Sequence, residues 1–137
     1  MRAIFADTGY WVAVIHPRDA LHKRAMVVSQ QLGQFTIITS EMVLVEVLNM
    51  FSRRGAHLRD AATKTVQAIT SDPSIEVVPQ TRRLFREALD LYQSRADKEW
   101  SLTDCASFVI MRQRNINEAL TDDHHFTQNG YKALLKA

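Results

Sequence analysis

Short apolar runs alternate along this chain with longer segments in which apolar residues recur at helical spacing. The runs indicate strands at residues 3–6, 35–39, 74–78 and 119–121, with a fifth strand expected within 131–135. The longer segments indicate helices at residues 10–15, 19–32, 40–54, 58–70, 81–94 and 101–113. Strands that alternate with helices predict an α/β fold, in which helices cover both faces of a mostly parallel sheet of about five strands.

Acidic residues stand where these elements meet. Asp7 and Asp123 follow strand-like runs, and Asp104 lies in the first turn of the helix over 101–113. Ligands of parallel α/β sheets bind at the carboxyl ends of the strands, so we expect these acids to meet there if their elements are neighbours. Glu46 interrupts an apolar helix, and none of its helical neighbours is a cation. Four carboxylates without Lys or Arg partners are suited to a hard cation such as Mg²⁺ or Mn²⁺.

Each acid also has a purely structural interpretation, and the sequence leaves these open. Asp7 fits the cap of the helix that follows it, and Asp104 fits a capping box with Ser101. Glu46 could lie on a narrow solvent-exposed stripe of its helix, because an unpaired carboxylate is costly to bury. Adjacent acids such as the Asp122–Asp123 pair are common in turns, and at most one of them is expected to point into a cleft.

The composition narrows the class of protein. A chain of 137 residues is expected to form a single domain over residues 1–137. With 17 Lys and Arg against 15 Asp and Glu, the net charge is +2, which permits nucleic-acid binding without arguing for it. Cys105 is the single cysteine, so no intrachain disulfide can form. No signal peptide or membrane span is indicated, and a soluble cytoplasmic protein is expected.

Other candidate chemistry is weaker. His124 and His125 suggest zinc, but adjacent histidines do not easily bind one ion, and no cysteine cluster accompanies them. No Gly-rich phosphate loop or Gly-x-Ser-x-Gly motif is present. Arg53, Arg54 and Arg59 cluster near a helix end, where they form either a solvated loop or a contact to a phosphate backbone.

Four segments together resemble the motifs of PIN-domain nucleases. They are Phe5–Thr8, the helix that carries Glu46, Ser101–Phe108 and Leu120–Phe126. The last two are the most specific, because a Thr-Asp pair before Ser-Phe is followed at the family's spacing by Leu-Thr-x-Asp-x-His-Phe. The resemblance covers the chain from its first strand to its last, and the size is similar to that of the toxins of VapBC-type toxin–antitoxin pairs.

The resemblance implies a three-layer α/β/α sandwich and a Mg²⁺- or Mn²⁺-dependent endoribonuclease acting as a toxin. It places the catalytic and metal-binding acids at Asp7, Glu46, Asp104 and Asp123, with supporting hydroxyls at Thr8, Ser101 and Thr103. It also implies an RNA substrate, a homodimer and a cognate antitoxin, which could inhibit by placing a basic side chain among the carboxylates.

Three alternatives to an RNA-cleaving toxin are considered. A housekeeping RNA-processing nuclease or a structure-specific DNA nuclease could use the same site, and the sequence does not separate these. A nucleic-acid-binding module with a dead site is disfavoured because all four acids are present. A phosphorylated receiver-type switch is disfavoured because Asp7 stands alone after the first strand and Lys132 lies inside the last expected element.

Overall fold

The computed structural model describes residues 2–137. Its strands are β1 (Arg2–Ala6), β2 (Phe35–Ser40), β3 (Ile75–Val78), β4 (Glu118–Leu120) and β5 (Lys132–Ala133). Its helices are α1 (Thr8–Ile15), α2 (His22–Gln31), α3 (Glu41–Phe51), α4 (Ala56–Ser71), α5 (Arg82–Ser94), α6 (Leu102–Gln113) and α7 (His124–Gln128). Most of these elements lie within a few residues of the positions that the sequence predicts.

The strands form one sheet in the order β3-β2-β1-β4-β5, and every neighbouring pair is parallel. β1 is central: Phe5 pairs with Ile38 of β2 on one side and with Ala119 of β4 on the other. Parallel neighbours need long crossover connections, and helices supply them here. The predicted parallel sheet of about five strands is therefore confirmed.

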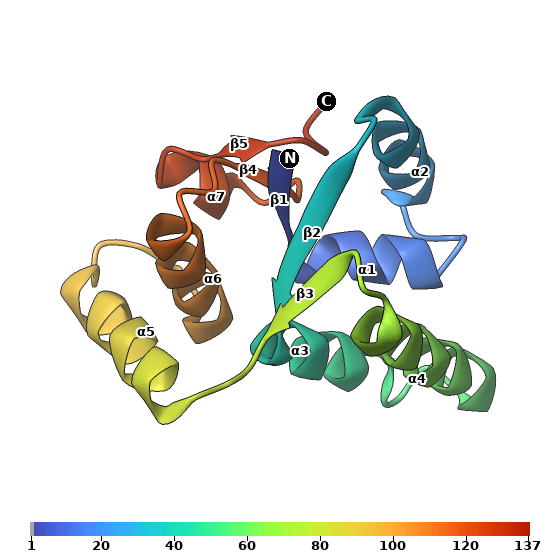
Figure 1. Ribbon diagram of the computed structural model, residues 1–137. Helices are drawn as coiled ribbons and strands as arrows, with labels where there is room; N and C mark the ends of the chain where they lie inside the picture. The colour runs from blue at the N-terminus through green and yellow to red at the C-terminus, as the bar shows by residue number, and fades with distance from the viewer. Residues whose placement is uncertain (1) are drawn as a thin grey trace.

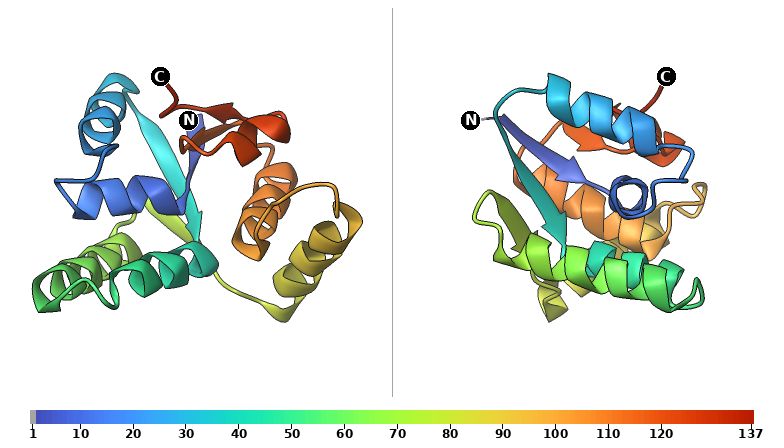
Figure 2. Two further views of the ribbon diagram at one scale, coloured as in Figure 1. Left: turned by 180° about the vertical axis from the view of Figure 1, so that it is seen from behind. Right: turned by 90° about the vertical axis from the view of Figure 1, so that its right-hand side faces the viewer.

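The helices complete a three-layer α/β/α sandwich, which confirms the expected fold (Figures 1 and 2). α6, with α5 packed against it, lies on one side of the sheet, while α1, α2 and α4 lie on the other. The core between the layers is aromatic and aliphatic. Phe5 and Phe108 are fully buried, and the Phe108 ring packs edge-on against Phe126 with ring centroids 4.9 Å apart. This packing fixes α6 against α7.

Local turns shift several helix boundaries from the predicted ones. α2 begins at His22 rather than at residue 19, because the Asp19 carboxylate accepts the Leu21 N–H at 3.0 Å and the Asp19 carbonyl accepts the His22 N–H at 3.0 Å. α3 ends at Phe51 rather than near residue 54. Gly55 then has a φ of 90°, a conformation that glycine adopts at low cost, and α4 starts immediately after it.

The C-terminal part of the chain differs most from the prediction. The expected strand over 131–135 is only the two-residue β5, and the short helix α7 was not expected. Asp123 caps α7, since one of its carboxylate oxygens accepts the His125 N–H at 2.9 Å. Among residues 2–137, no helix combines the length and the apolar character that crossing a membrane requires.

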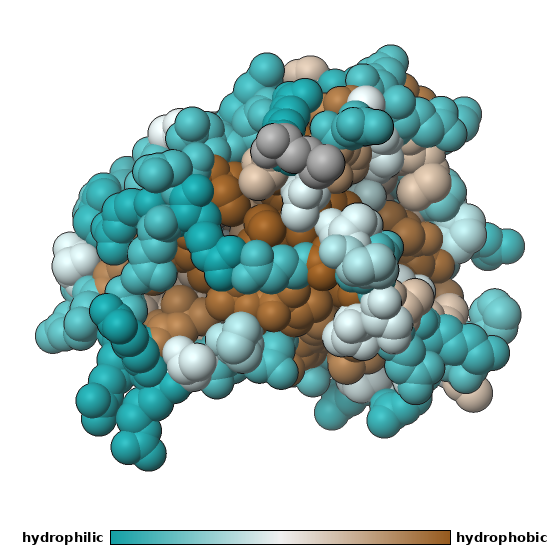
Figure 3. Space-filling model, viewed as in Figure 1, coloured by the Kyte–Doolittle hydropathy of each residue, from teal (hydrophilic) through white to brown (hydrophobic). Residues whose placement is uncertain are grey.

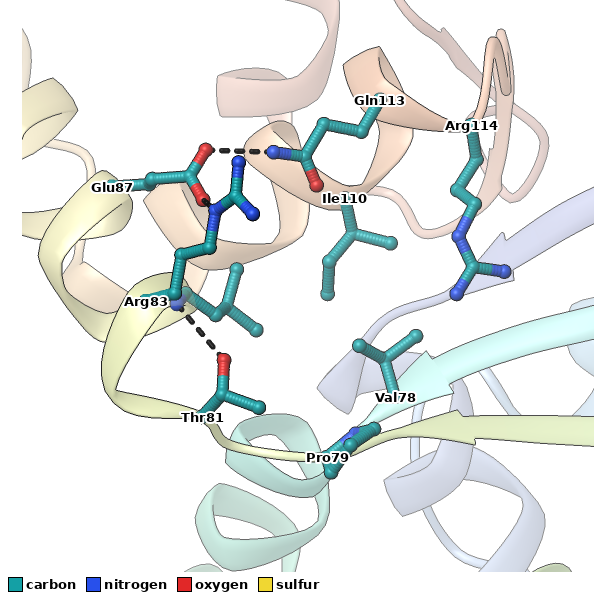
Figure 4. Close-up of a pocket in the computed structure, with 9 residues that line it drawn as sticks. Val78, Pro79, Thr81, Arg83, Glu87, Ile110, Gln113 and Arg114 are labelled. Atoms are coloured by element: carbon teal, nitrogen blue, oxygen red, sulfur yellow. Dashed lines mark hydrogen bonds and ion pairs between the residues drawn. The ribbon is translucent and has the colours of Figure 1, made fainter.

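Apolar side chains gather across the middle of the face shown in Figure 3, framed by hydrophilic ones. Part of this region is a hollow of about 300 Å³ between the end of β3, α5 and α6 (Figure 4). Its apolar lining includes Val78, Leu84 and Ile110. Its two cations are already paired: Arg83 lies 3.3 Å from Glu87, and Arg114 lies 2.6 Å from Glu76. The hollow therefore offers no free charge to a ligand.

Candidate active site

The strand order brings the predicted acids to one edge of the sheet. Because β1 and β4 are parallel neighbours, their carboxyl ends meet, and the Asp7 N–H donates to the Leu120 carbonyl at 3.3 Å. A cleft of about 580 Å³ opens at this point. All four predicted acids line it: Asp7, Glu46, Asp104 and Asp123. The remaining lining residues are Thr8, Gly9, Glu99, Ser101, Asp122, His124 and His125.

Asp7 is the most buried of the four acids, with 6% of its surface exposed. It stands at the N-cap position of α1, yet its side chain makes no capping hydrogen bond. Its carboxylate instead accepts the Thr121 hydroxyl at 2.9 Å. Burial raises the pKa of Asp7 to about 7, and the charges of Asp104 and Asp123 act in the same direction. The capping interpretation of Asp7 is therefore wrong for its side chain, which faces the cleft.

Asp104 combines the structural and the site interpretations. It closes a capping box at the start of α6: its N–H donates to the Ser101 hydroxyl at 3.0 Å, and its carboxylate accepts the Ser101 N–H at 3.1 Å. Burial raises the pKa of Asp104, and the nearby charge of Asp123 adds to the effect, against hydrogen bonds from Ser101 and His125. The adjacent Cys105 is buried, and burial raises its thiol pKa to about 11, so it stays protonated, as expected for a core residue.

Glu46 reaches the cleft from α3. It is half-buried, and one carboxylate oxygen accepts the Thr8 hydroxyl at 2.6 Å. Thr8 is the first residue of α1 and is itself buried. The contact ties α3 to the turn after β1, so Glu46 is held toward the acids and does not simply occupy a solvent-exposed stripe.

Asp123 is half-buried, and both its backbone N–H and its carboxylate form hydrogen bonds. Its N–H donates to the Thr121 hydroxyl at 3.1 Å, while its carboxylate accepts the N–H of His125. Asp122 also lines the cleft, although it is exposed. Both acids therefore border the same opening, and the expectation that at most one of their side chains points into a cleft stays a prediction.

His125 is a site residue that the sequence-based interpretation missed. Its Nδ1 lies 3.0 Å from an Asp104 carboxylate oxygen and 3.3 Å from an Asp123 oxygen. Among the described residues, the compact group of possible metal ligands is Asp123, His124 and His125, whose ligand atoms lie within 4.8 Å of one another. The signal available in the sequence was the position of His125 two residues after Asp123, at the start of a helix that was not predicted.

Thr121 is the second missed residue. Its side chain is buried, and its single hydroxyl donates to the Asp7 carboxylate and accepts the Asp123 N–H. One group thus joins the acid after β1 to the acid after β4. The Leu-Thr step before the acids was recognised as part of a motif, but the sequence alone did not show that its hydroxyl points at Asp7.

The family model of the PIN domain matches residues 4–130 of this chain. The chain belongs to the PIN-domain family. It is 28% identical over 128 residues to the 23S rRNA-specific endonuclease VapC20 from two strains of Mycobacterium tuberculosis, with 93% of this chain and 95% of the relative covered. The crystal structure of Mycobacterium tuberculosis VapC20, described as a toxin that cleaves the sarcin–ricin loop, superposes with a TM-score of 0.84 over the same shares of the two chains.

The other residues singled out from the sequence do not line the acidic cleft of this PIN domain. Thr103 is half-buried on α6 and does not line the cleft. Arg53, Arg54 and Arg59 are exposed around the α3–α4 connection, also outside the cleft. Arg54 lies over the Phe51 ring at 5.8 Å, so part of its surface is already used. The predicted RNA contacts of these three arginines stay a prediction.

The donor set of the PIN-domain cleft fits a hard divalent cation. It combines carboxylate oxygens with hydroxyl oxygens, and no Lys or Arg is among the lining residues. Burial is the main cause of the raised pKa of Asp7, and the charges of Asp104 and Asp123 add to it. A cation bound beside these carboxylates would favour their ionised forms. The imidazole of His125 adds one nitrogen ligand, which Mn²⁺ accepts more readily than Mg²⁺.

Proposed function

We propose that this protein is a divalent-metal-dependent endoribonuclease that acts as the toxin of a toxin–antitoxin pair. One observation carries the proposal: Asp7, Glu46, Asp104 and Asp123 line a single cleft in which no described Lys or Arg neutralises them. Burying unpaired carboxylates destabilises the fold. A bound divalent ion would neutralise them and would also bind the phosphate of a substrate. The similarity to an rRNA-specific endonuclease supports the same conclusion.

Asp7, Asp104 and Asp123 are proposed to hold Mg²⁺ or Mn²⁺ directly, with Glu46 acting partly through water. Such an ion supplies an activated water and neutralises charge on the phosphate. The chain's own residues prepare the site. The Ser101 capping box fixes the rotamer of Asp104, the Thr121 hydroxyl fixes Asp7, and the Thr8 hydroxyl fixes Glu46. Fixed carboxylates do not have to reorganise during the reaction.

His125 is proposed to position two of the metal-binding acids. Its Nδ1 lies 3.0 Å from an Asp104 carboxylate oxygen and 3.3 Å from an Asp123 oxygen. The ring therefore contacts both acids at once and ties the start of α7 to the start of α6.

RNA is proposed as the substrate, and the resemblance to VapC20 supports RNA over DNA. The specific target of this chain is left to experiment, because 28% identity does not carry a recognition sequence across. A housekeeping RNA-processing nuclease and a structure-specific DNA nuclease use the same kind of site, and they are separated by comparing RNA and DNA in one assay. A cytoplasmic location belongs to the same proposal.

A cognate antitoxin is proposed as the protein partner. Six acidic residues and no Lys or Arg are among the residues that line the cleft, so an Arg or Lys of an antitoxin segment fits among the carboxylates and displaces the metal. The test is inhibition by the antitoxin with every basic side chain of its binding segment replaced. Inhibition that survives this replacement contradicts the mode of binding but not the nuclease.

A homodimer is also proposed. Val45 and Leu48 of α3 lie one turn apart and are 56% and 36% exposed, although both are aliphatic. Aliphatic residues exposed together on a helix are typical of a surface that another protein covers. Val45→Asp is expected to convert a dimer to a monomer in sedimentation, whereas a wild-type protein that sediments as a monomer contradicts the proposal.

The decisive experiment is RNA cleavage by the purified protein with Mg²⁺ or Mn²⁺, with EDTA, and with Asp104→Asn. Cleavage is expected to require the metal and to fall at least about 100-fold in the variant, whose fold should persist because the amide can still accept from the Ser101 N–H. Glu76→Gln is the matched control, because Glu76 is paired with Arg114 away from the cleft. Full activity of Asp104→Asn would falsify the assignment.

A further inference from the structure

A second hollow adjoins the acidic cleft. It has a volume of about 590 Å³, within the range of ligand pockets, and its lining includes Tyr92, Ala96, Lys98 and Trp100. Glu99 and Ser101 line both the hollow and the cleft, so the two openings are adjacent. Ser101 is also the residue that caps α6 and fixes Asp104. A ligand that spans both openings would therefore pass directly from the acids to Tyr92.

The floor of the hollow is rigid. The indole N–H of Trp100 donates to the Gln128 side chain at 3.0 Å, and its ring packs edge-on against Phe108 with centroids 4.9 Å apart. The Arg95 guanidinium lies 5.0 Å from the Trp100 ring centre. Trp100 is thus held from several sides and is only 4% exposed. Its position does not depend on a bound ligand, so binding does not carry the cost of ordering this side chain.

Tyr92 differs from Trp100 in being open to solvent. It is 52% exposed near the end of α5, and the other large aromatic exposed among residues 2–137 is Phe85, two turns earlier on the same helix. Phe85 lines neither the hollow nor the cleft. An exposed aromatic ring beside a site for phosphate chemistry offers a stacking surface, because every nucleobase has a π face.

The polar groups of the hollow suit one nucleotide. Lys98 is the cation that lines it, and its ammonium lies 3.9 Å from Asp97, at the limit of an ion pair. By contrast, Arg114 in the hollow of Figure 4 makes two hydrogen bonds of 2.7 and 2.6 Å to Glu76. Lys98 is therefore the more available donor for a phosphate or a base edge. Gln93 adds an amide for a base edge.

We propose that this hollow is the subsite for one unpaired base of the RNA, adjacent to the phosphate that lies at the acids. The base stacks on Tyr92, and Lys98 contacts the backbone on the same side. This inference rests on the proposed nuclease function and deepens it. It requires the RNA to be single-stranded, or to have one base flipped out, next to the cleavage point. A continuous duplex keeps its bases stacked on one another and cannot fill the hollow.

The test uses mononucleotides and needs neither a known target nor a metal. Metal-free, ¹⁵N-labelled protein is titrated with 5′-AMP, 5′-UMP and ribose 5-phosphate while backbone amide shifts are recorded. The nucleotides are expected to shift amides within residues 92–101, and ribose 5-phosphate, which has no base, is expected to bind far more weakly. Tyr92→Ala should weaken AMP binding about 10-fold, whereas Tyr92→Phe keeps the ring and should bind as the wild type does.

Phe85→Ala is the matched control, since it removes an exposed aromatic from the same helix outside the hollow. It is expected to bind AMP as the wild type does. Equal AMP affinity in Tyr92→Ala and the wild type overturns the subsite, as do equal shifts with ribose 5-phosphate. Loss of AMP binding in Phe85→Ala together with a change from dimer to monomer in sedimentation also overturns it, because a second copy of the chain then covers this face.

RNA cleavage separates failure of the subsite from failure of the nuclease. In steady-state cleavage, Tyr92→Ala is expected to raise KM about 10-fold with little change in kcat, because Tyr92 does not line the cleft that holds the acids. Metal-dependent cleavage that is unaffected by Tyr92→Ala removes the subsite and leaves the nuclease. Binding of AMP in the hollow by a wild-type protein that cleaves no RNA with metal removes the nuclease and leaves the hollow as a nucleotide-binding site.

Discussion

Two carboxylates on the strands are paired with arginine, whereas no Lys or Arg is among the residues that line the acidic cleft. Glu76 of β3 and Glu118 of β4 each receive two hydrogen bonds from one guanidinium, from Arg114 and from Arg2 respectively. Those hydrogen bonds lower the pKa of both glutamates. Asp7 lies just beyond the central strand without a cation, and burial raises its pKa to about 7. The same sheet thus pairs the acids along its strands with arginine and leaves the acids at its carboxyl edge without a Lys or Arg partner.

This difference indicates that the acidic cleft binds a cation that the protein itself does not supply. Arginine is available and pairs well elsewhere in this protein, so its absence among the cleft residues is not a matter of composition. In place of Lys or Arg, neutral donors hold the cleft acids: the Thr8 hydroxyl donates to Glu46, the Thr121 hydroxyl donates to Asp7, and the Ser101 N–H donates to Asp104. Hydroxyls fix orientation without neutralising charge, which leaves the attraction for a cation intact.

The largest expected effect comes from removing the charge of Asp7. Its pKa is about 7 in the folded protein against an ordinary value of 3.8, so between these values the folded state binds more protons than the unfolded state. Stability of the metal-free protein should therefore fall as pH rises from 4 to above 7. Asp7→Asn should remove most of this slope, leaving the part due to Asp104, and should stabilise the metal-free protein at pH 8 by about 2–4 kcal/mol. Urea unfolding at pH 5 and pH 8 measures both effects.

Glu76→Gln is the control for the Asp7 experiment, because Glu76 is a paired acid whose pKa is lowered. It should leave the pH slope between 5 and 8 unchanged. A metal-free wild type that is equally stable at both pH values contradicts the account of Asp7, whatever the activity of the variants.

Divalent metal should give the next largest effect. Mn²⁺ or Mg²⁺ at about 100 times its dissociation constant is expected to stabilise the fold by about 2.7 kcal/mol, because it binds the folded state. The gain should be greater at pH 8 than at pH 5, since protonated carboxylates are poor ligands. Thermal unfolding with metal and then with excess EDTA measures it. Stabilisation that persists undiminished in the Asp7→Asn, Asp104→Asn double variant would mean that the ion binds elsewhere.

Thr121→Val should have an intermediate effect. The valine keeps the shape but removes the hydroxyl that joins the Asp7 carboxylate to the Asp123 N–H. Leaving such buried groups without a partner costs about 1–3 kcal/mol of stability, and Mn²⁺ affinity should fall as the two acids lose their common anchor. Calorimetry of Mn²⁺ binding distinguishes this from a packing effect. Thr121→Ser restores the hydroxyl and should recover metal affinity, and a serine variant no better than valine contradicts the role.

Arg114→Gln should have the smallest effect. It breaks the bidentate pair with Glu76, but both side chains are more than two-fifths exposed, at 42% and 47%, so solvent screens the pair. The expected loss is at most about 1 kcal/mol, reduced further by salt, with RNA cleavage unchanged. Chemical unfolding at low and high salt measures it. A loss of cleavage in this variant would show that the Arg114–Glu76 pair affects the acidic cleft, and would contradict the separation of the paired strand carboxylates from the cleft acids.

Local pattern was enough to predict most of the fold. The apolar runs that became β1, β2 and β3 are short and bounded by polar turns, so their length and flanking residues identified them. α7 was missed because His124–Gln128 is too short to show helical periodicity, and its start depends on the Asp123 cap. The start of α2 was misplaced because the Asp19 side chain competes for the first backbone donors of the turn.

The sequence by itself determined which residues have the chemistry. The positions of Asp7, Asp104 and Asp123 after strands or at a helix start, and of Glu46 within an apolar helix, follow from local pattern together with the motif resemblance. Residue type and spacing are local properties, so they can be read without knowing what is close in space.

Only the tertiary structure decided how these residues act together. The pairing of β1 with β4 joins positions 114 residues apart, so that Thr121 donates to Asp7, and the start of α7 turns His125 toward Asp104. The raised pKa of Asp7 and the joining of the acidic cleft to the Tyr92 hollow likewise depend on packing. Burial and distance arise from contacts between segments remote in sequence, and no local pattern contains them.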